Sequence, residues 1–193
     1  IKANDEQDAL YTLSLTNFEV KKMFRSMVKG WFQSVTSTVY NDFIKALLMD
    51  DVDSMNEFMN DIALCIFSNF DTAKSASSKD APERFYHGFV LGLMVELDGR
   101  FRLTSNRESG FGRYDVMLTP VDREKDDAYI IEFKVHKPGK EKDLQETLTN
   151  ALSQIEAKKY AAHLIAEGIE PRRIRKYGFA FQGKACLIGA AVH

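Results

Sequence analysis

Three ionisable residues lie among apolar neighbours in two short segments of the chain. Glu132 and Lys134 occur in YIIEFKV, residues 129–135, and Asp115 occurs in RYDVML, residues 113–118. Side chains two residues apart on a β-strand point to the same face, so Glu132 and Lys134 share one face of an otherwise apolar strand. Burying both charges costs free energy unless each finds a partner or a metal. The pair is therefore either a buried salt bridge or part of a functional site, and the nearby acid favours the site.

The chemistry that these residues suit is hydrolysis of a phosphodiester. If the two segments pair as neighbouring strands, Asp115 lies beside Glu132. The two carboxylates and the carbonyl oxygen of Phe133 then form a set of hard oxygen ligands, which suits Mg²⁺ or Mn²⁺. Such an ion polarises a phosphoryl oxygen and activates a water molecule at neutral pH. Lys134 would lie within reach to orient that water or to stabilise charge in the transition state.

Hydrophobic periodicity predicts the elements that position these residues. After residue 80 the apolar spacing indicates a helix, three strands, a long helix and two final strands. This order is typical of an α/β domain with a mixed sheet. The expected ranges are 81–97 for the first helix, 100–105, 113–119 and 128–135 for the first three strands, 142–167 for the long helix, and 177–181 and 185–191 for the last two strands.

The first third of the chain has a helical period instead. Three helices are expected there, beginning near Thr16, Thr38 and Ser54, the first and last with a glutamate three residues later that completes a capping box. The segment 71–80 contains Ala, Ser and Lys without an apolar period and is the best candidate for a linker. We therefore expect two parts, a helical extension with its linker at 1–79 and an α/β domain at 80–193.

Composition and charge exclude several classes of protein. With 193 residues, 45% of them hydrophobic, and only 4 prolines, the chain is typical of a globular protein. A net charge of −2 argues against a protein that coats nucleic acid through general basicity. The residues from 132 to the end nevertheless hold 11 Lys and Arg against 7 Asp and Glu, so a polyanion would be attracted to this C-terminal third.

The cysteines and the apolar runs predict a cytoplasmic protein. Cys65 and Cys186 lie in apolar stretches and are expected to be buried thiols of a reducing compartment rather than a disulfide or a zinc site. The longest uninterrupted apolar run, 62–67, is far shorter than a membrane-spanning helix requires. The N-terminus carries no signal-peptide pattern.

The order of the acids and the lysine resembles a known superfamily. Asp115, then Glu132-x-Lys134 on the next strand, behind a helix that carries an acid, resembles the PD-(D/E)XK nuclease superfamily. Three stretches are similar to the nuclease-like family that forms the C-terminal part of bacterial predicted AAA-ATPase-like proteins, and the similarity runs from about residue 80 to the end. These stretches are FYHGF at 85–89, SNRESGFGRYD at 105–115 and IEFK at 131–134. LTNFEV at 15–20 resembles the junction after the ATPase part, which fits a chain that begins with Ile1.

The resemblance implies a fold, an activity and a set of site residues. The fold would be a restriction-endonuclease-like core with the order αβββαββ. The activity would be hydrolysis of DNA to a 5′-phosphate product, in a parent chain with an ATPase-like domain before the nuclease part. Asp115 and Glu132 would be metal ligands, Lys134 the catalytic lysine, Glu83 an additional acid on the first helix, and Gln154 the glutamine beside the site.

The chain departs from the superfamily pattern at two places. Relatives commonly carry a tyrosine one helical turn after the glutamine, whereas here Lys158 holds that position and Tyr160 follows two residues later. The proline of the superfamily name is replaced by Tyr114. That proline is dispensable to the chemistry.

Several of the residues also have simpler structural interpretations, which the sequence leaves open. Glu83 follows Asp80 by three residues, so it can complete a capping box. His87 lies one helical turn after Glu83 and is expected to be a hydrogen-bonded core histidine. Arg107 and Arg113 flank a glycine-containing turn, where they either support the turn or contact phosphates. The basic run RRIRK is expected to be a solvated loop, although it also suits contact with a nucleic-acid backbone.

Two functions of different classes follow from the sequence. The first is a metal-dependent nuclease domain that binds and hydrolyses DNA. The alternative is a catalytically inactive module that keeps the nuclease fold and docks onto DNA or protein. A weaker, third hypothesis is that the N-terminal helices mediate self-association. No base-reading motif is present, and the oligomeric state does not follow from the sequence.

Overall fold

A five-stranded sheet and the helices around it make up the described part of the chain. The computed structural model describes residues 37–70, 88–109 and 112–191. The helices are α2 (Ser37–Leu48), α3 (Val52–Phe70), a helical segment at 88–93 that continues as η1 (Met94–Leu97), α5 (Leu144–Ala157), α6 (Ala162–Ala166) and η2 (Pro171–Arg173). The strands are β1 (Phe101–Ser109), β2 (Gly112–Pro120), β3 (Ala128–Val135), β4 (Ile174–Gln182) and β5 (Ala185–Ala190).

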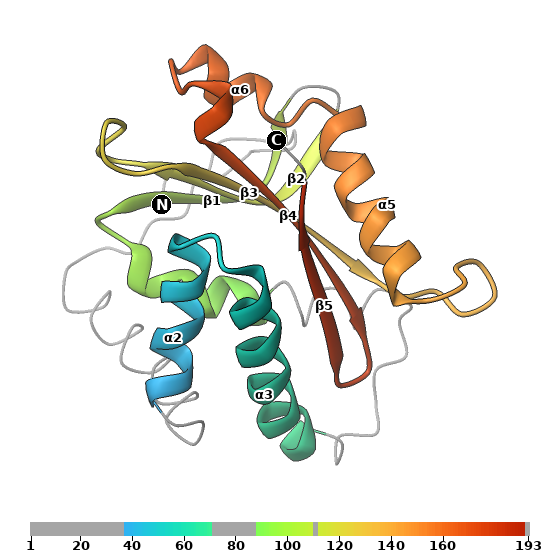
Figure 1. Cartoon of the computed structure of the whole chain (residues 1–193). Helices are drawn as coiled ribbons and strands as arrows, with labels where there is room; N and C mark the ends of the chain where they lie inside the picture. Colours follow the sequence, from blue (N-terminus) through green and yellow to red (C-terminus); the bar gives the residue numbers. More distant parts are fainter. Residues whose placement is uncertain (1–36, 71–87, 110–111, 192–193) are drawn as a thin grey trace, which may run out of the picture. The chain divides into compact units, whose positions relative to one another are not determined.

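The strands follow one another across the sheet in chain order (Figure 1). β3 and β4 run parallel, and the other neighbours run antiparallel. A parallel pair needs a crossover connection, which α5 and α6 provide here. The predicted α/β domain with a mixed sheet is therefore confirmed. The first helix of the predicted αβββαββ order includes residues 81–87, which lie outside the described residues, so that full order stays a prediction.

Helices α2 and α5 cover opposite faces of β4. Gly178 and Phe179 are neighbours on that strand, so they face opposite ways. Phe43 of α2 packs edge-on against Phe179, with ring centroids 6.5 Å apart. On the other face, a Cβ atom added to Gly178 would lie 3.1 Å from the Cβ of Ala151, so the missing side chain lets α5 approach the sheet closely. Burial of β3 and β4 on both faces explains why β3 is almost entirely apolar.

Two asparagines of α3 hydrogen-bond to the main chain of the last strand. Asn56 donates to the carbonyl of Ile188 at 2.8 Å and accepts from its N–H at 2.8 Å. Asn60 donates to the carbonyl of Cys186 at 2.8 Å and accepts from its N–H at 2.9 Å. The two amides lie one helical turn apart and match alternate residues of β5. They replace the next strand and cover an edge that would otherwise offer unpaired groups.

Removing both amides is expected to destabilise the domain. Each substitution of Asn56 or Asn60 by alanine leaves one N–H and one C=O of β5 without this partner, which costs about 1–3 kcal/mol. We expect the double variant to show a clearly lower free energy of unfolding in urea than the wild type. Glu57→Ala is the matched control, because Glu57 is exposed on the same helix. Equal stability of the double variant and the control would contradict this role.

The predicted long helix at 142–167 is in fact two helices, α5 and α6. α5 ends at Ala157, and Lys159 adopts a left-handed conformation with φ of 53°. The N–H of Lys159 donates to the carbonyl of Glu156 at 3.0 Å, and the N–H of Tyr160 donates to that of Ile155 at 3.2 Å. This is the Schellman pattern that closes many helices. The apolar period continues across the break because Tyr160 and Leu164 both turn into the same core.

The basic run at 172–176 is not the solvated loop that was expected. It begins in η2 and enters β4 at Ile174. Arg173 and Arg175 both pair with Asp127, at 3.0 Å and 2.9 Å. Lys176 pairs with Glu156 at 2.6 Å. Acidic residues distant in sequence therefore neutralise most of this run.

Some expectations fall on residues that the structure does not describe. These are the first helix near Thr16, the linker at 71–80, and the residues Glu83 and His87; the predicted boundary between 79 and 80 also stays a prediction. Cys186 is buried, as expected, and burial raises the pKa of its thiol. Among the described helices, none is both long enough and apolar enough to cross a membrane.

Candidate active site

The two candidate carboxylates lie where β2 and β3 stop pairing. The last recorded pair of these strands is Val116 with Ile131, and continuing the register by one residue places Asp115 opposite Glu132. Asp115 Oδ2 accepts a hydrogen bond of 2.7 Å from the N–H of Phe133. A side-chain oxygen thus takes the place of a strand carbonyl. This bond fixes the Asp115 carboxylate against the segment that carries Glu132 and Lys134.

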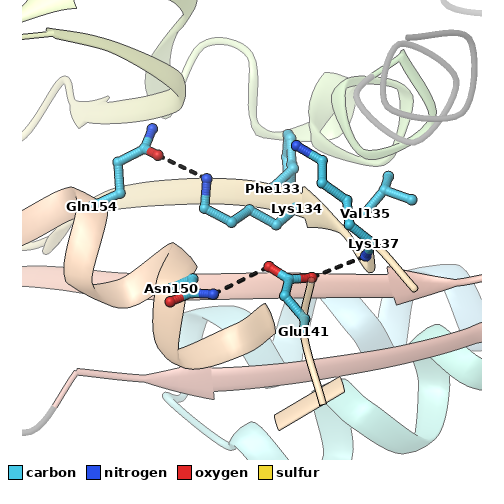
Figure 2. Close-up of a pocket in the computed structure, with 7 residues that line it drawn as sticks. All are labelled: Phe133, Lys134, Val135, Lys137, Glu141, Asn150 and Gln154. Atoms are coloured by element: carbon cyan, nitrogen blue, oxygen red, sulfur yellow. Dashed lines mark hydrogen bonds between the residues drawn. The ribbon is translucent and has the colours of Figure 1, made fainter. Parts of the chain in front are cut away.

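Gln154 connects the acid and the lysine of β3. Its amide nitrogen donates to Glu132 Oε1. Its carbonyl oxygen accepts from Lys134 Nζ at 2.7 Å, as Figure 2 shows. Glu132 is only 3% exposed, so this partner matters for keeping the side chain in place. The alternative of a simple salt bridge between Glu132 and Lys134 does not describe this arrangement, because a neutral amide lies between the two charges.

Helix α5 places Gln154 over the site. Asp143 caps its N-terminus by accepting from the N–H of Glu146 at 2.9 Å. Leu148, Ala151 and the other buried residues of α5 face the sheet. The close approach of α5 to the sheet at Gly178 therefore also sets how near Gln154 lies to β3. The sequence placed this glutamine beside the site only through the superfamily resemblance.

Tyr160 completes the hydrogen bonds of Gln154. The amide nitrogen of Gln154 donates to the Tyr160 hydroxyl at 3.1 Å. Burial raises the pKa of Tyr160, the hydrogen bond from Gln154 opposes that effect, and the charges of Glu132 and Asp115 add to it. The turn at Lys159 gives the physical reason why a tyrosine displaced in sequence still reaches the glutamine. A helical spacing rule alone would have missed it.

A pocket of about 390 Å³ lies next to Lys134 and Gln154. Glu141 and Asn150, which line it, were not singled out from the sequence (Figure 2). Asn150 stands four residues before Gln154 on α5, and this i, i+4 spacing is the signal that could have found it. The remaining lining residues are Phe133, Val135 and Lys137.

Glu141 holds the loop that borders the pocket. One of its oxygens accepts from the N–H of Lys137 at 3.0 Å and from the Thr147 hydroxyl at 2.8 Å, and the other accepts from Asn150 at 3.1 Å. Burial alone raises the pKa of Glu141, but these hydrogen bonds together outweigh it and hold the pKa below its ordinary value. Glu141 is therefore charged and fully occupied in supporting the loop.

The donor set at Asp115 and Glu132 fits a hard divalent cation. Both side chains offer only oxygen, and the carbonyl of Phe133 between Glu132 and Lys134 adds a third oxygen of the same kind. Within the described residues, no group of three or more His, Cys, Asp or Glu could hold a metal. Glu83, the further acid expected from the sequence, lies outside those residues, as do the side chains of Arg107 and Arg113.

One of the comparisons with known proteins found a match that includes this part of the chain. A family model described as the PD-(D/E)XK nuclease superfamily matches residues 81–191. That range contains Asp115, Glu132, Lys134 and Gln154. Searches of curated proteins and of solved structures gave no match. Because the match to this family model covers more than half of the sequence, the chain belongs to the PD-(D/E)XK nuclease superfamily.

Proposed function

We propose that this protein is a metal-dependent nuclease that hydrolyses phosphodiester bonds in DNA. The observation that supports this most is that Gln154 joins Glu132 to Lys134 within a chain of this superfamily, with Asp115 held on the next strand. Mg²⁺ or Mn²⁺ is the proposed cofactor. Asp115, Glu132 and the carbonyl of Phe133 would hold it, with Glu83 as an additional acid.

Each described residue has a distinct part in the proposed reaction. When bound, the metal supplies a Lewis acid that polarises the phosphodiester and lowers the pKa of water. Gln154 orients the Lys134 ammonium by accepting one of its protons in a hydrogen bond, so that the remaining N–H groups can face the phosphate. The N–H of Phe133 and the amide of Gln154 orient the two carboxylates before substrate arrives. This preorganisation avoids a rearrangement during the reaction.

The parent protein is proposed to place an ATPase-like domain before this one. The support is the stretch at 15–20, which resembles the junction that follows the ATPase part in similar proteins. Such a domain would control when or where the nuclease acts. The alternative, an inactive docking module of the same fold, predicts binding without hydrolysis and is separated from the nuclease by the experiment below.

The test of the proposed function is an assay of products on end-labelled oligonucleotides. Single-stranded DNA, duplex DNA and RNA of one sequence are incubated with the protein and Mg²⁺ or Mn²⁺. We expect metal-dependent fragments of DNA that carry a 5′-phosphate and are absent with EDTA and with Glu132→Gln. Binding without fragments on any substrate would favour the docking module. Fragments that persist in EDTA would contradict the proposed use of a metal.

The hydroxyl of Tyr160 is expected to contribute to activity through Gln154. Tyr160→Phe keeps the ring, which packs edge-on against Tyr114 at 6.2 Å, and removes one hydrogen bond to the Gln154 amide. A loss of about 1 kcal/mol corresponds to a roughly fivefold lower rate of cleavage. Tyr114→Phe is the matched control, because it removes a hydrogen bond to Thr104 of 2.8 Å instead. Equal rates for the two variants would show that Tyr160 supports only the fold.

A further inference from the structure

Three lysines lie together on the loop between β3 and α5. Lys137, Lys140 and Lys142 are all exposed, and Lys137 also lines the pocket beside Lys134 (Figure 2). In the described part of the chain, no acidic side chain forms an ion pair with any of them. The loop therefore presents three positive charges to solvent at the border of the candidate active site.

The described arginines differ from these lysines. Every arginine whose side chain the structure describes pairs with a carboxylate. The run at 172–176 is the most basic stretch of the sequence. Arg173 and Arg175 nevertheless pair with Asp127, and Lys176 pairs with Glu156. An anion bound there would first have to replace existing partners. Among residues 37–70, 88–109 and 112–191, no carboxylate competes in this way for the three loop lysines.

The loop is held in one shape by its acidic residues. Glu141 accepts from the N–H of Lys137 and from two side chains of α5, as described above. The N–H of Lys140 donates to the carbonyl of Lys137 at 3.0 Å. Asp143 caps α5, and Glu146 accepts from the N–H of Lys142 at 2.6 Å. The hydrogen bonds of these carboxylates go to main-chain or α5 groups and not to the lysine ammonium groups.

We propose that Lys137, Lys140 and Lys142 bind successive backbone phosphates of the nucleic-acid strand that enters the candidate active site. This inference rests on the proposed function, and it adds where the substrate lies. Lysine ammonium groups neutralise phosphates without regard to base sequence. Lys137 and Lys134 both line the pocket, so a strand with one phosphate bound at Lys137 would have a neighbouring part of its backbone near Lys134. These three lysines, called the lysine platform below, position the strand, and the carboxylates and Lys134 act on it.

The test measures binding of labelled oligonucleotides in EDTA, so that cleavage plays no part. The triple variant K137Q/K140Q/K142Q is compared with the wild type at about 50 and 200 mM salt. Losing three phosphate contacts should make the negative slope of log K against log salt shallower by about 2 for single-stranded DNA. The advantage of the wild type over the variant should accordingly shrink about 16-fold between the two salt concentrations.

A control variant with the same loss of charge makes the test specific. K45Q/R172Q/K176Q removes three cations that already pair with carboxylates, at 2.9 Å, 2.7 Å and 2.6 Å. We expect its affinity and salt slope to stay close to those of the wild type. Equal losses in the two triple variants would overturn the lysine platform, because they would show attraction by overall charge alone.

The remaining outcomes separate the lysine platform from the proposed function. If the wild type binds and the loop variant binds equally well, the lysine platform is wrong and the nuclease proposal stands. If the wild type binds none of the oligonucleotides at low salt, the lysine platform and the nuclease proposal are both wrong. Metal-dependent cleavage by the wild type, measured separately on the same oligonucleotides, tests the nuclease proposal without reference to the loop.

Discussion

Replacing Lys134 by methionine is expected to slow DNA cleavage by about 10²- to 10⁴-fold while the protein stays folded. Lys134 shares a face of β3 with Glu132, and its ammonium donates to Gln154 at 2.7 Å. Methionine keeps most of the aliphatic length and removes the charge. The substitution should therefore leave packing largely intact and remove the group that stabilises negative charge on the phosphate.

Lys176→Met is the matched control for this prediction. Lys176 lies on the neighbouring strand, in register with Ile130, and its ammonium pairs with Glu156 rather than with the site. The same chemical change there should leave the cleavage rate within a factor of about two, since a partly exposed ion pair is worth at most about 1 kcal/mol. Rates are measured under single-turnover conditions, and circular dichroism verifies folding. Cleavage by Lys134→Met at the wild-type rate would remove Lys134 from the mechanism.

Mn²⁺ is expected to raise the melting temperature of the wild type and not that of Asp115→Asn. An ion that binds only the folded state at about 100 times its dissociation constant stabilises it by about 2.7 kcal/mol. For a chain of this size that corresponds to roughly 5–10 °C. An asparagine at position 115 still accepts from the N–H of Phe133 and has nearly the same shape as aspartate. It lacks the negative charge that the cation requires.

Asp122→Asn provides the control for nonspecific metal effects. Asp122 also accepts main-chain hydrogen bonds, from Glu124 and Lys125 at 3.1 Å and 3.2 Å, but it lies in the exposed turn before β3. Its Mn²⁺-dependent shift should equal that of the wild type. Without metal, we expect Asp115→Asn to be within about 1 kcal/mol of wild-type stability, because the lost charge-assisted hydrogen bond offsets relief from the nearby Glu132. Equal shifts for all three proteins would place the metal elsewhere.

The sequence was informative where one strand or one local pattern determines the structure. The bounds of β3 were predicted correctly because a strand buried on both faces forms a nearly continuous apolar run, and here that run follows the charged loop at 122–127. The two-residue period of a strand placed Glu132 and Lys134 on one face. The expected pairing of the two strands placed Asp115 near them. Gln154 required the superfamily resemblance, since a glutamine on an amphipathic helix carries no signal of its own.

What the sequence did not show depends on contacts between distant segments. Apolar periodicity continues through Lys159, so it could not reveal the left-handed turn that ends α5 and brings Tyr160 to Gln154. Asn60 lies 126 residues from its partner on β5, so it looked like an ordinary polar helix residue. The arginines at 173 and 175 were expected in a solvated loop because their partner Asp127 is distant in the chain. Tertiary contacts decide each of these cases.

Nicking of supercoiled plasmid DNA at low salt tests the central claim most directly. The wild type and Glu132→Gln are each incubated with Mg²⁺, with Mn²⁺ and with EDTA. The account predicts relaxed and linear DNA only for the wild type with a divalent metal, because Glu132→Gln keeps the hydrogen bond from Gln154 but loses a metal-binding charge. Nicking by Glu132→Gln at the wild-type rate, or nicking in EDTA, would contradict a metal-dependent site built on Asp115, Glu132 and Lys134.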